Sequence, residues 1–444
     1  MFRDKTKRAQ KRLESLPCLA LQAEQVEFIY SPMAFKNEII QLIRQAKTRI
    51  FVTALYWQND EAGQEILDEI YRAKQDKPEL EVKILIDWHR AQRNLLGAEK
   101  SATNADWYCE QRQKYQLADD PNLFFGVPIN TREVFGVLHI KGFVFDDTVL
   151  YSGASINNVY LQQNEKYRYD RYQKITHPQL ADSMVAFIRE FLLNSDVVLP
   201  LDSVNRPKTK EIRQNIRHFR KNLALNGQYK LSSAVDFGNE LTVTPLFGLG
   251  STGNVLNCTI EDLFQLVDEK LTICTPYFNF PRTLQQKIRH LLRKGKKIEI
   301  IVGDKVANDF YIPPEQPFKM VGALPYLYEN NLRRFSKKFE REMAQGQLTI
   351  RTWKDGTNTY HLKGVWIDDN YILLTGNNLN PRAWRLDAEN GLFIHDPKQQ
   401  LLPQVVQELD CIRQHTTVLQ HYTELEEMRQ YPAPVQKLLK KFAR

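Results

Sequence analysis

The stretches HIKGFVFDD (residues 139–147) and HLKGVWIDD (361–369) decide the fold of this 444-residue chain. Each places a lysine two residues after a histidine and an aspartate five residues after that lysine, as His-x-Lys-x-x-x-x-Asp. His139 and His361 are 361 − 139 = 222 residues apart, so each half of the chain carries one copy. A single His-x-Lys is most often a chance match, but two copies in one frame indicate a duplication. Two histidines that meet in the fold can divide the work of nucleophile and proton carrier.

The duplication extends to the segments on the N-terminal side of each motif. The first half reads as helix 34–47, strand 49–57, helix 64–75 and strand 80–88, and the second as helix 257–270, strand 271–278, helix 283–295 and strand 297–304. Apolar strands that alternate with helices are typical of α/β folds with largely parallel sheets, covered on both faces. We therefore predict two α/β/α halves related by an approximate two-fold axis, with the active site on that axis.

The polar and basic stretch 201–229 separates the repeats and is predicted to be a helical linker. The N-terminal half is then 1–200 and the C-terminal half 230–444. Each half is long enough to bury a core of its own. The sequence gives no indication of the oligomeric state.

The charge balance indicates a partner that carries phosphate. The chain has 61 basic and 53 acidic residues, a net charge of +8. This suits an anionic membrane surface or a nucleic acid, and it is compatible with non-specific association with polyanions or ribosomes. No apolar run has the length of a spanning helix, and no apolar stretch follows the basic N-terminus as in a signal peptide. The 5 cysteines form no CxxC pair, which predicts reduced thiols in a cytoplasmic protein and no zinc site.

The residues of each motif suggest different roles. In an extended segment, residues i and i+2 point to the same face, so each histidine and the following Lys141 or Lys363 can bind one ligand. The aspartates lie at an odd offset within Asp-Asp pairs typical of turns. Asp146 and Asp368 are therefore expected to tie down the hairpins, away from the ligand.

Small and amide side chains follow each motif and can donate hydrogen bonds to phosphate oxygens. They are Gly153, Ser155 and Asn157 in the first half, and Gly376, Asn378 and Asn380 in the second. The glycines would allow a ligand to approach the backbone. An acid comes later in each half: Glu165 lies 26 residues after His139, and Glu389 lies 28 after His361. A carboxylate on the second ring nitrogen would fix the tautomer of a catalytic histidine.

These motifs match the HxKxxxxD signature of the phospholipase D superfamily. Longer strings resemble one branch of it, the bacterial phospholipase-D-like phosphatidylserine synthases, almost end to end. The strings are DWHRAQR (87–93), TNADWYC (103–109), GVPINTRE (126–133), YRYDRY (167–172), GDKVANDFYIP (303–313), GALPYLYENNLRRF (322–335) and GNNLNPRAWRLD (376–387).

The resemblance implies transfer of a phosphatidyl group from CDP-diacylglycerol to L-serine in phospholipid biosynthesis, through a phosphatidyl-histidine. It implies His139 as nucleophile and His361 as general acid and base. Lys141, Lys363, Asn157 and Asn380 would stabilise charge on the phosphate oxygens, and no metal or other cofactor is needed. It also implies peripheral association with the cytoplasmic face of the inner membrane.

Three segments are candidates for contact with that membrane. NNLRRFSKKFEREM (330–343) has apolar residues at helical spacing among basic ones, as in an interfacial helix, and Arg333, Arg334, Lys337 and Lys338 would dock on anionic lipid. The aromatic and proline-rich segment 310–328 could line an acyl-chain channel, and the basic tail 435–444 is a further candidate. Any of these can instead be a helix packed on the core.

Three alternatives stay open. One is a nuclease of the same superfamily, and another is a phospholipase D or cardiolipin-synthase-like enzyme with a different acceptor. The third is a polybasic scaffold without activity. The charged run containing Arg168, Asp170 and Arg171 could bind a zwitterion, although a solvated charge cluster is the simpler interpretation. The run Asp87–Arg90 is a guess for cytidine contacts, from its place at the end of a strand.

Overall fold

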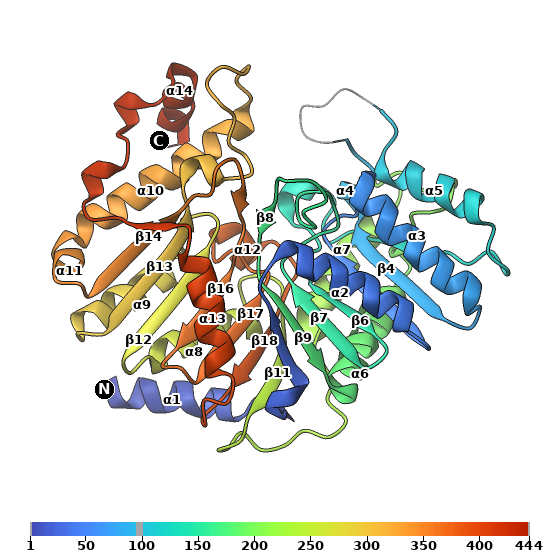
Figure 1. The fold of residues 1–444 in the computed structure, drawn as a ribbon, viewed down its shortest axis with the longest axis horizontal. Coiled ribbons are helices and arrows are strands. Elements are labelled where there is room, and N and C mark those ends of the chain that lie inside the picture. Colours follow the sequence, from blue (N-terminus) through green and yellow to red (C-terminus); the bar gives the residue numbers. More distant parts are fainter. Residues whose placement is uncertain (1, 95–100, 443–444) are drawn as a thin grey trace.

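Two α/β halves lie side by side in the computed structural model, which describes residues 2–94 and 101–442 (Figure 1). The N-terminal sheet has the order β10 (Leu199–Pro200), β5 (Phe124–Val127), β4 (Glu81–Asp87), β3 (Arg49–Ala54), β6 (Gly142–Phe145), β7 (Thr148–Ser152), β9 (Tyr172–Thr176), β2 (Val26–Ile29). The C-terminal sheet has the order β19 (Thr416–Val418), β14 (Leu348–Trp353), β13 (Lys297–Gly303), β12 (Lys270–Thr275), β16 (Gly364–Ile367), β17 (Tyr371–Thr375), β18 (Glu389–His395), β11 (Thr242–Gly248), with β1 (Leu19–Ala20) at its end.

The two orders correspond strand for strand, and each pair of neighbours runs in the same sense in both sheets. This confirms the predicted pair of α/β halves. The sheets are mixed, however, where largely parallel sheets were predicted. In these two sheets only β3, β4 and β5, and their counterparts β12, β13 and β14, run parallel to one another. The strands that follow each His-x-Lys return as hairpins, and hairpin strands are antiparallel.

Helices cover these sheets. The N-terminal half has α2 (Pro32–Gln45), α3 (Glu61–Asp76), α4 (Trp88–Ala91), α5 (Asn104–Tyr115) and α6 (Pro178–Phe187). The C-terminal half has α8 (Val255–Leu266), α9 (Arg282–Arg293), α10 (Leu324–Lys338), α11 (Glu340–Ala344), α12 (Pro381–Arg385), α13 (Leu402–Arg413) and α14 (Ala433–Phe442).

Helix α2 shows why these segments are helical. Ser31 accepts a hydrogen bond from the Ala34 amide at 3.1 Å as the N-cap, and Pro32 follows in the first turn. Phe35 and Ile39, one turn apart, are buried against the sheet.

Asp146 and Asp368 lie in the hairpin turns, where the sequence analysis placed them. Both have a left-handed backbone, with φ of +50°. Asp146 accepts hydrogen bonds from the backbone amides of residues 47–49 at 2.8–3.1 Å. Asp368 accepts them from the amides of residues 268–270 at 2.7–2.8 Å. Each aspartate thus fixes its hairpin to the start of the neighbouring central strand, β3 or β12, and so fixes the position of the His-x-Lys segment that precedes the hairpin.

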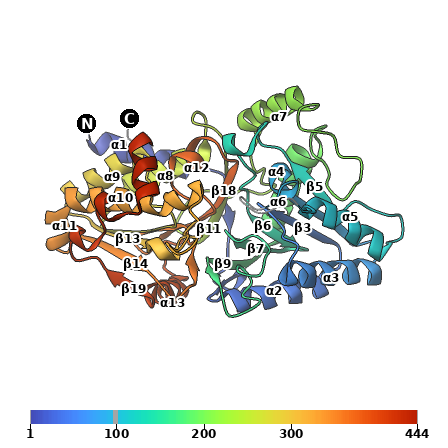
Figure 2. The ribbon, with the colours of Figure 1, turned by 90° about the horizontal axis from the view of Figure 1, so that it is seen from above.

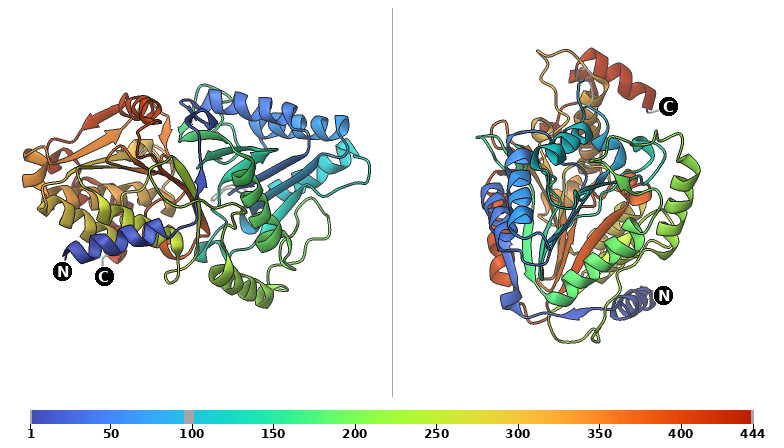
Figure 3. Two further views of the ribbon diagram at one scale, coloured as in Figure 1. Left: turned by 90° about the horizontal axis from the view of Figure 1, so that it is seen from below. Right: turned by 90° about the vertical axis from the view of Figure 1, so that its right-hand side faces the viewer.

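The N-terminal segment departs from the predicted boundary at residue 1. Helix α1 (Phe2–Glu14) lies against the C-terminal half (Figure 3), where Arg12 Nε bonds Asp262 Oδ2 at 2.7 Å. Strand β1 pairs with β11 of the C-terminal sheet. The chain therefore begins on the C-terminal half and crosses to the N-terminal half after β1.

The predicted linker contains one helix, α7 (Arg213–Asn226), on the outside of the N-terminal half (Figure 2). Its apolar residues Ile216, Phe219 and Leu223 are buried in a core cluster that includes residues of both halves. The segment therefore contributes to packing between the halves.

Candidate active site

Two short backbone pairings join the halves and position both motifs. Strand β8 (Arg168–Tyr169) pairs in parallel with β15 (Thr359–Tyr360), and the His361 amide donates to the Tyr169 carbonyl at 2.8 Å. At the second pairing, Leu138 forms a parallel bridge with Ala388, and the His139 amide donates to the Ala388 carbonyl at 2.9 Å. Each His-x-Lys segment thus runs beside a segment of the other half, just before its hairpin.

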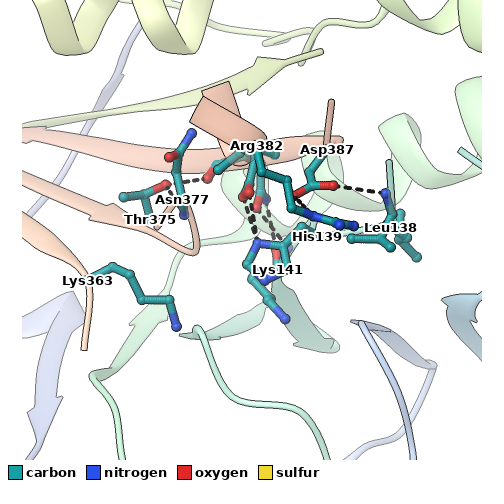
Figure 4. A network of polar contacts seen from close by, with 12 residues as sticks. Leu138, His139, Lys141, Lys363, Thr375, Asn377, Arg382 and Asp387 are labelled. Atoms are coloured by element: carbon teal, nitrogen blue, oxygen red, sulfur yellow. Dashed lines mark hydrogen bonds and ion pairs between the residues drawn. The ribbon is translucent and has the colours of Figure 1, made fainter. Parts of the chain in front are cut away.

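The second pairing brings Glu389 to His139. The two side chains are buried, and the Nδ1 atom of His139 lies 2.9 Å from Glu389 Oε2. A carboxylate at the second ring nitrogen of each histidine was predicted. At His139, however, this carboxylate comes from the other half of the chain. Figure 4 shows this site beside the Arg382–Asp387 ion pair, with Lys363 extending from the C-terminal half.

The first pairing brings Asp170 to His361, where the sequence analysis expected Glu389 of the same half; the acid expected from the N-terminal half was Glu165, for His139. Asp170 Oδ2 lies 3.2 Å from His361 Nδ1 and 2.9 Å from Lys363 Nζ, and it is buried. The predicted acid Glu165 is exposed on the preceding turn. The prediction for Glu165 is therefore corrected to Asp170.

A signal for Asp170 exists in the sequence. Glu389 is the first residue of β18, and Asp170 stands two residues before the start of the equivalent strand β9. The choice of Glu165 followed residue type and interval from the histidine. A choice by position relative to the next strand would have found Asp170.

The Nδ1 atom of His361 has further neighbours, the Tyr160 hydroxyl at 2.9 Å and Lys363 Nζ at 2.5 Å. Within the described part of the chain, Nε2 of His361 and Nε2 of His139 make no hydrogen bond to protein. These are the two nitrogen atoms left for a substrate.

The lysines pack under glycines of the opposite half. A Cβ atom on Gly153 would lie 2.6 Å from Lys363 Nζ, and one on Gly376 would lie 2.9 Å from Lys141 Cγ. The glycines therefore make room for the lysines of the two motifs, where a ligand was predicted to approach. Both lysines are buried, at 1% exposure, which is rare for this residue type outside functional sites.

The charges of the site are strongly coupled. Burial and the Lys363 charge lower the pKa of Lys141 to about 7. Burial lowers the pKa of His139 well below its ordinary value, and the two lysines lower it further. Burial and Lys363 lower the pKa of His361 to about 4, against the opposing effect of Asp170. An anionic ligand would raise all three values, because it stabilises the protonated forms.

The predicted amide donors have partly different roles. Asn157 and Asn380 occupy equivalent positions, and each caps the following turn, accepting from the amide of Tyr160 at 3.0 Å or of Ala383 at 2.9 Å. Ser155 is buried, and the buried Oδ1 of Asn378 has no hydrogen-bond partner among the described residues.

Sequence reasoning missed two other asparagines. Asn390 bonds both the amide and the carbonyl of Lys141, each at 2.8 Å, and so fixes the backbone at that residue. Asn377 is fully buried, and its Nδ2 has no partner among the described residues. It lies next to Gly376, which makes it a further candidate donor to a substrate.

A cavity of about 570 Å³ lies between the two halves, and Tyr160 and Tyr277 connect its lining residues Arg168 and Asp309 to His361. It is lined from both halves, with Tyr56, Arg90, Asn157 and Arg168 from the first, and Asp309 and residues 310–312 from the second. Asp87, in contrast, is fully buried. It caps α4 and accepts a hydrogen bond from the Leu138 amide at 2.9 Å. Of the run Asp87–Arg90 that was suggested for cytidine contacts, Arg90 lines the cavity. Within residues 2–94 and 101–442, no group of three or more metal-binding side chains is found.

Comparison with known proteins identifies the family. A family described as "Cardiolipin synthase, PLD-like domain" matches residues 261–415. The CDP-diacylglycerol–serine O-phosphatidyltransferase of Haemophilus influenzae is 76% identical over 444 residues, which cover 100% of this chain and 98% of the relative.

The chain belongs to the phosphatidylserine synthase family.

A second phosphatidylserine synthase, that of Escherichia coli, is 51% identical over 440 residues, covering 99% of this chain and 96% of the relative. The crystal structure of the phosphatidylserine synthase from Haemophilus influenzae superposes with a TM-score of 0.97 at 75% identity, over 99% of this chain and 97% of that one. The resemblance to this branch of the phospholipase D superfamily is thereby confirmed.

Proposed function

We propose that this chain transfers the phosphatidyl group of CDP-diacylglycerol to the hydroxyl of L-serine, which gives phosphatidylserine and CMP. The observation that carries the proposal is the pair of buried histidines, each held at Nδ1 by a carboxylate of the other half. Two buried lysines accompany them and supply positive charge for a phosphate. Membership in the phosphatidylserine synthase family supports the choice of donor and acceptor.

The reaction proceeds in two displacements at phosphorus. His139 Nε2 attacks the diacylglycerol-bearing phosphorus, a phosphorus–nitrogen bond forms, and the bond to CMP breaks as His361 gives its proton to the leaving oxygen. In the second step His361 takes the proton of the serine hydroxyl, the serine oxygen attacks phosphorus, and the bond to His139 breaks. Each proton transfer of this kind contributes on the order of 10²–10⁴-fold.

The electrostatics favour this division of roles. The carboxylates of Asp170 and Asp309 both act to raise the pKa of His361. His139 has one carboxylate, Glu389, whose own pKa is raised by burial, and burial and the two lysines lower the pKa of His139. His139 is therefore neutral and able to attack, whereas His361 is the better carrier of a proton.

The test of the function is incubation with labelled L-serine, with and without CDP-diacylglycerol. We expect lipid-soluble label and an equal amount of CMP only when both substrates are present. Glycerol or phosphatidylglycerol as acceptor, and a single-stranded DNA substrate, test the alternative activities. Transfer to one of these acceptors, or cleavage of the DNA, in place of serine incorporation would overturn the proposal.

Asp170→Asn tests the corrected position of the orienting acid. The amide retains the shape but loses the charge that faces His361 and Lys363, so we expect kcat for serine incorporation to fall by about 10²-fold. Glu165→Gln, on the exposed turn, is expected to keep the wild-type rate. The two variants are to be compared in one assay after their folding is checked by circular dichroism. A larger loss in Glu165→Gln would restore the original assignment.

The predicted interfacial helix is corrected by the structure. The apolar residues of this segment, Leu332, Phe335 and Phe339, are 4–7% exposed and pack in the core of the C-terminal half. Arg333 is half-buried, with its Nη2 bonded to Glu427 at 3.0 Å. Helix α10 ends at Lys338. Its apolar face is therefore unavailable to lipid, although Arg334, Lys337 and Lys338 are exposed.

We place the membrane contact instead at the loop before α10. Phe318 is 42% and Met320 71% exposed there, and residues 310–312 of the same segment line the cavity between the halves. Helix α14 packs against this loop and carries three exposed lysines, Lys437, Lys440 and Lys441. The last two residues of the basic tail lie outside the described residues. Apolar side chains beside basic ones are typical of a surface that docks on anionic lipid. Among the described residues, no helix has the length and apolarity needed to cross a bilayer.

Two sets of substitutions separate the two candidate surfaces. Phe318→Ser with Met320→Ser should strongly reduce co-sedimentation with anionic vesicles, while activity on substrate in detergent micelles survives. Arg334→Gln, Lys337→Gln and Lys338→Gln together should have a smaller effect that disappears at high salt, since each exposed cation contributes about 1 kcal/mol and is screened. If only the second set detaches the protein, α10 is the docking surface.

A further inference from the structure

An arginine and an aspartate that line the cavity between the halves form and break no bond in the two-step mechanism. Arg168 and Asp309 both line the cavity, and their side chains are 17% and 14% exposed. Arg168 Nη1 lies 3.8 Å from Asp309 Oδ2. This distance allows attraction between the charges but is too long for a hydrogen bond.

Both side chains have hydrogen-bonding capacity to spare. Arg168 Nε donates to Thr359 Oγ1 at 3.2 Å, and its two terminal amino groups make no hydrogen bond within the described chain. Asp309 Oδ1 accepts from the Tyr277 hydroxyl at 2.6 Å, while Oδ2 faces Arg168. Although burial raises the pKa of Asp309, Arg168 and His361 bring it below the ordinary value, so the carboxylate is charged at neutral pH.

Two tyrosines connect this pair to the proton-transferring histidine. The guanidinium of Arg168 stacks over the ring of Tyr160 at 5.0 Å, and the Tyr160 hydroxyl lies 2.9 Å from His361 Nδ1. The ring of Tyr277 meets that of His361 edge-on at 5.8 Å. A ligand held between Arg168 and Asp309 is thus within one side chain of His361.

The other charged residues of the run 168–171 already have partners within the protein. Asp170 is bound to His361 and Lys363. Arg171 is buried and bonds Glu408 at 2.7 Å, so the run is not a solvated cluster. Arg168 is the member of the run that reaches the cavity.

The position equivalent to Arg168 at the second pairing between the halves carries the opposite charge. Arg168 stands two residues before the acid Asp170, and Asp387 stands two residues before the acid Glu389. Asp387 accepts from the Val137 amide at 3.0 Å and pairs with Arg382 at 3.2 Å, so it is committed to the fold. The two pairings between the halves therefore differ in charge at this position. Such a difference is expected if one side of the site binds a second, different substrate.

We propose that Arg168 and Asp309 bind the amino acid acceptor as a zwitterion, with the α-carboxylate on Arg168 and the α-ammonium on Asp309. The acceptor hydroxyl is then directed towards His361, its general base. This inference rests on the proposed function. It also explains selectivity, because Asp309 repels an anionic acceptor such as a glycerol phosphate, and an amino alcohol without a carboxylate gains nothing from Arg168.

The test compares acceptors that differ in one charged group. L-Glycerate is L-serine with a hydroxyl in place of the ammonium, and ethanolamine is L-serine without the carboxylate. Asp309→Asn should lower the kcat/KM ratio of L-serine to L-glycerate by about 10- to 100-fold, the effect of one charge-assisted hydrogen bond. Arg168→Gln should lower the ratio of L-serine to ethanolamine to a similar extent. Loss of catalytic chemistry alone would affect both acceptors equally and leave each ratio unchanged.

Glu315→Gln is the matched control, since it removes the same charge from an exposed position of the neighbouring loop. It should leave both ratios at the wild-type value. Exchange of labelled CMP into CDP-diacylglycerol needs no acceptor and shows in each sample that the enzyme is folded. Asp309→Glu keeps the charge and is the second variant to use if Asp309→Asn does not fold. It should retain a higher kcat/KM ratio of L-serine to L-glycerate than Asp309→Asn. Unchanged ratios in both variants, with wild-type serine incorporation intact, would overturn the inference and leave the proposed function standing. Absence of serine incorporation by the wild type would instead refute the function.

Discussion

His139→Ala and His361→Ala are each expected to lower phosphatidyl transfer to L-serine by more than about 10⁴-fold. Each substitution removes one of the two ring nitrogens that make no protein hydrogen bond in the described chain, and the lysines cannot replace either role. Without His139 no nucleophile faces phosphorus. Without His361 the leaving CMP and the serine hydroxyl have no proton carrier.

The two variants differ in what they can trap. His361→Ala retains the nucleophile, so prolonged incubation with CDP-diacylglycerol labelled in its diacylglycerol should leave acid-labile label on His139, formed slowly because the leaving CMP has no proton donor. His139→Ala should give none. The labelled peptide is identified by mass spectrometry after rapid quenching at alkaline pH. Label on His361 in the His139→Ala protein would reverse the assignment of nucleophile and acid.

Lys141→Ala and Lys363→Ala are expected to lower kcat by about 10²–10³-fold each, the usual effect of removing one group that stabilises transition-state charge. Lys363 should have the larger effect, because its Nζ is also bonded to Asp170 at 2.9 Å. Its loss leaves the carboxylate without its cation and strengthens the hold of Asp170 on His361. Both lysines are buried, so substitution creates space that water can enter.

Steady-state assays at saturating L-serine measure this prediction, with Lys398→Ala as the control. Lys398 is exposed and pairs with Glu240 at 2.6 Å, and its loss should not change kcat. Thermal unfolding of each variant distinguishes lost catalysis from lost folding. An unchanged kcat in either buried-lysine variant, in a folded protein, would show that the positive charge is supplied elsewhere.

The sequence predicted the fold well where local patterns are strong. The predicted strands 49–57 and 297–304 correspond to β3 and β13, and the predicted helix 34–47 corresponds to α2. Apolar periodicity and capping residues act within one element, so a single sequence contains them. The sense of strand pairing was not visible in this way, because antiparallel return of the hairpins depends on contacts between elements.

The same distinction holds for the site. The histidines and lysines were found because they recur at a fixed spacing. Asp170 was missed because its partner His361 is 191 residues away, and only the pairing of β8 with β15 brings them together. The apolar stripe of α10 looked like a membrane-facing surface, since periodicity shows that a face is apolar but not what covers it.

The crossing of carboxylates between halves has a consequence for the ancestry of this architecture. Asp170 serves the histidine of the second repeat, and Glu389 serves that of the first. A single repeat on its own holds no complete histidine–carboxylate pair, so an unduplicated ancestor could work only as a homodimer that exchanged acids across a two-fold axis. Such a dimer must repeat every substitution on both sides. Fusion of the two copies removed that constraint, and a residue such as Arg168 could then arise at one junction while Asp387 occupied the other.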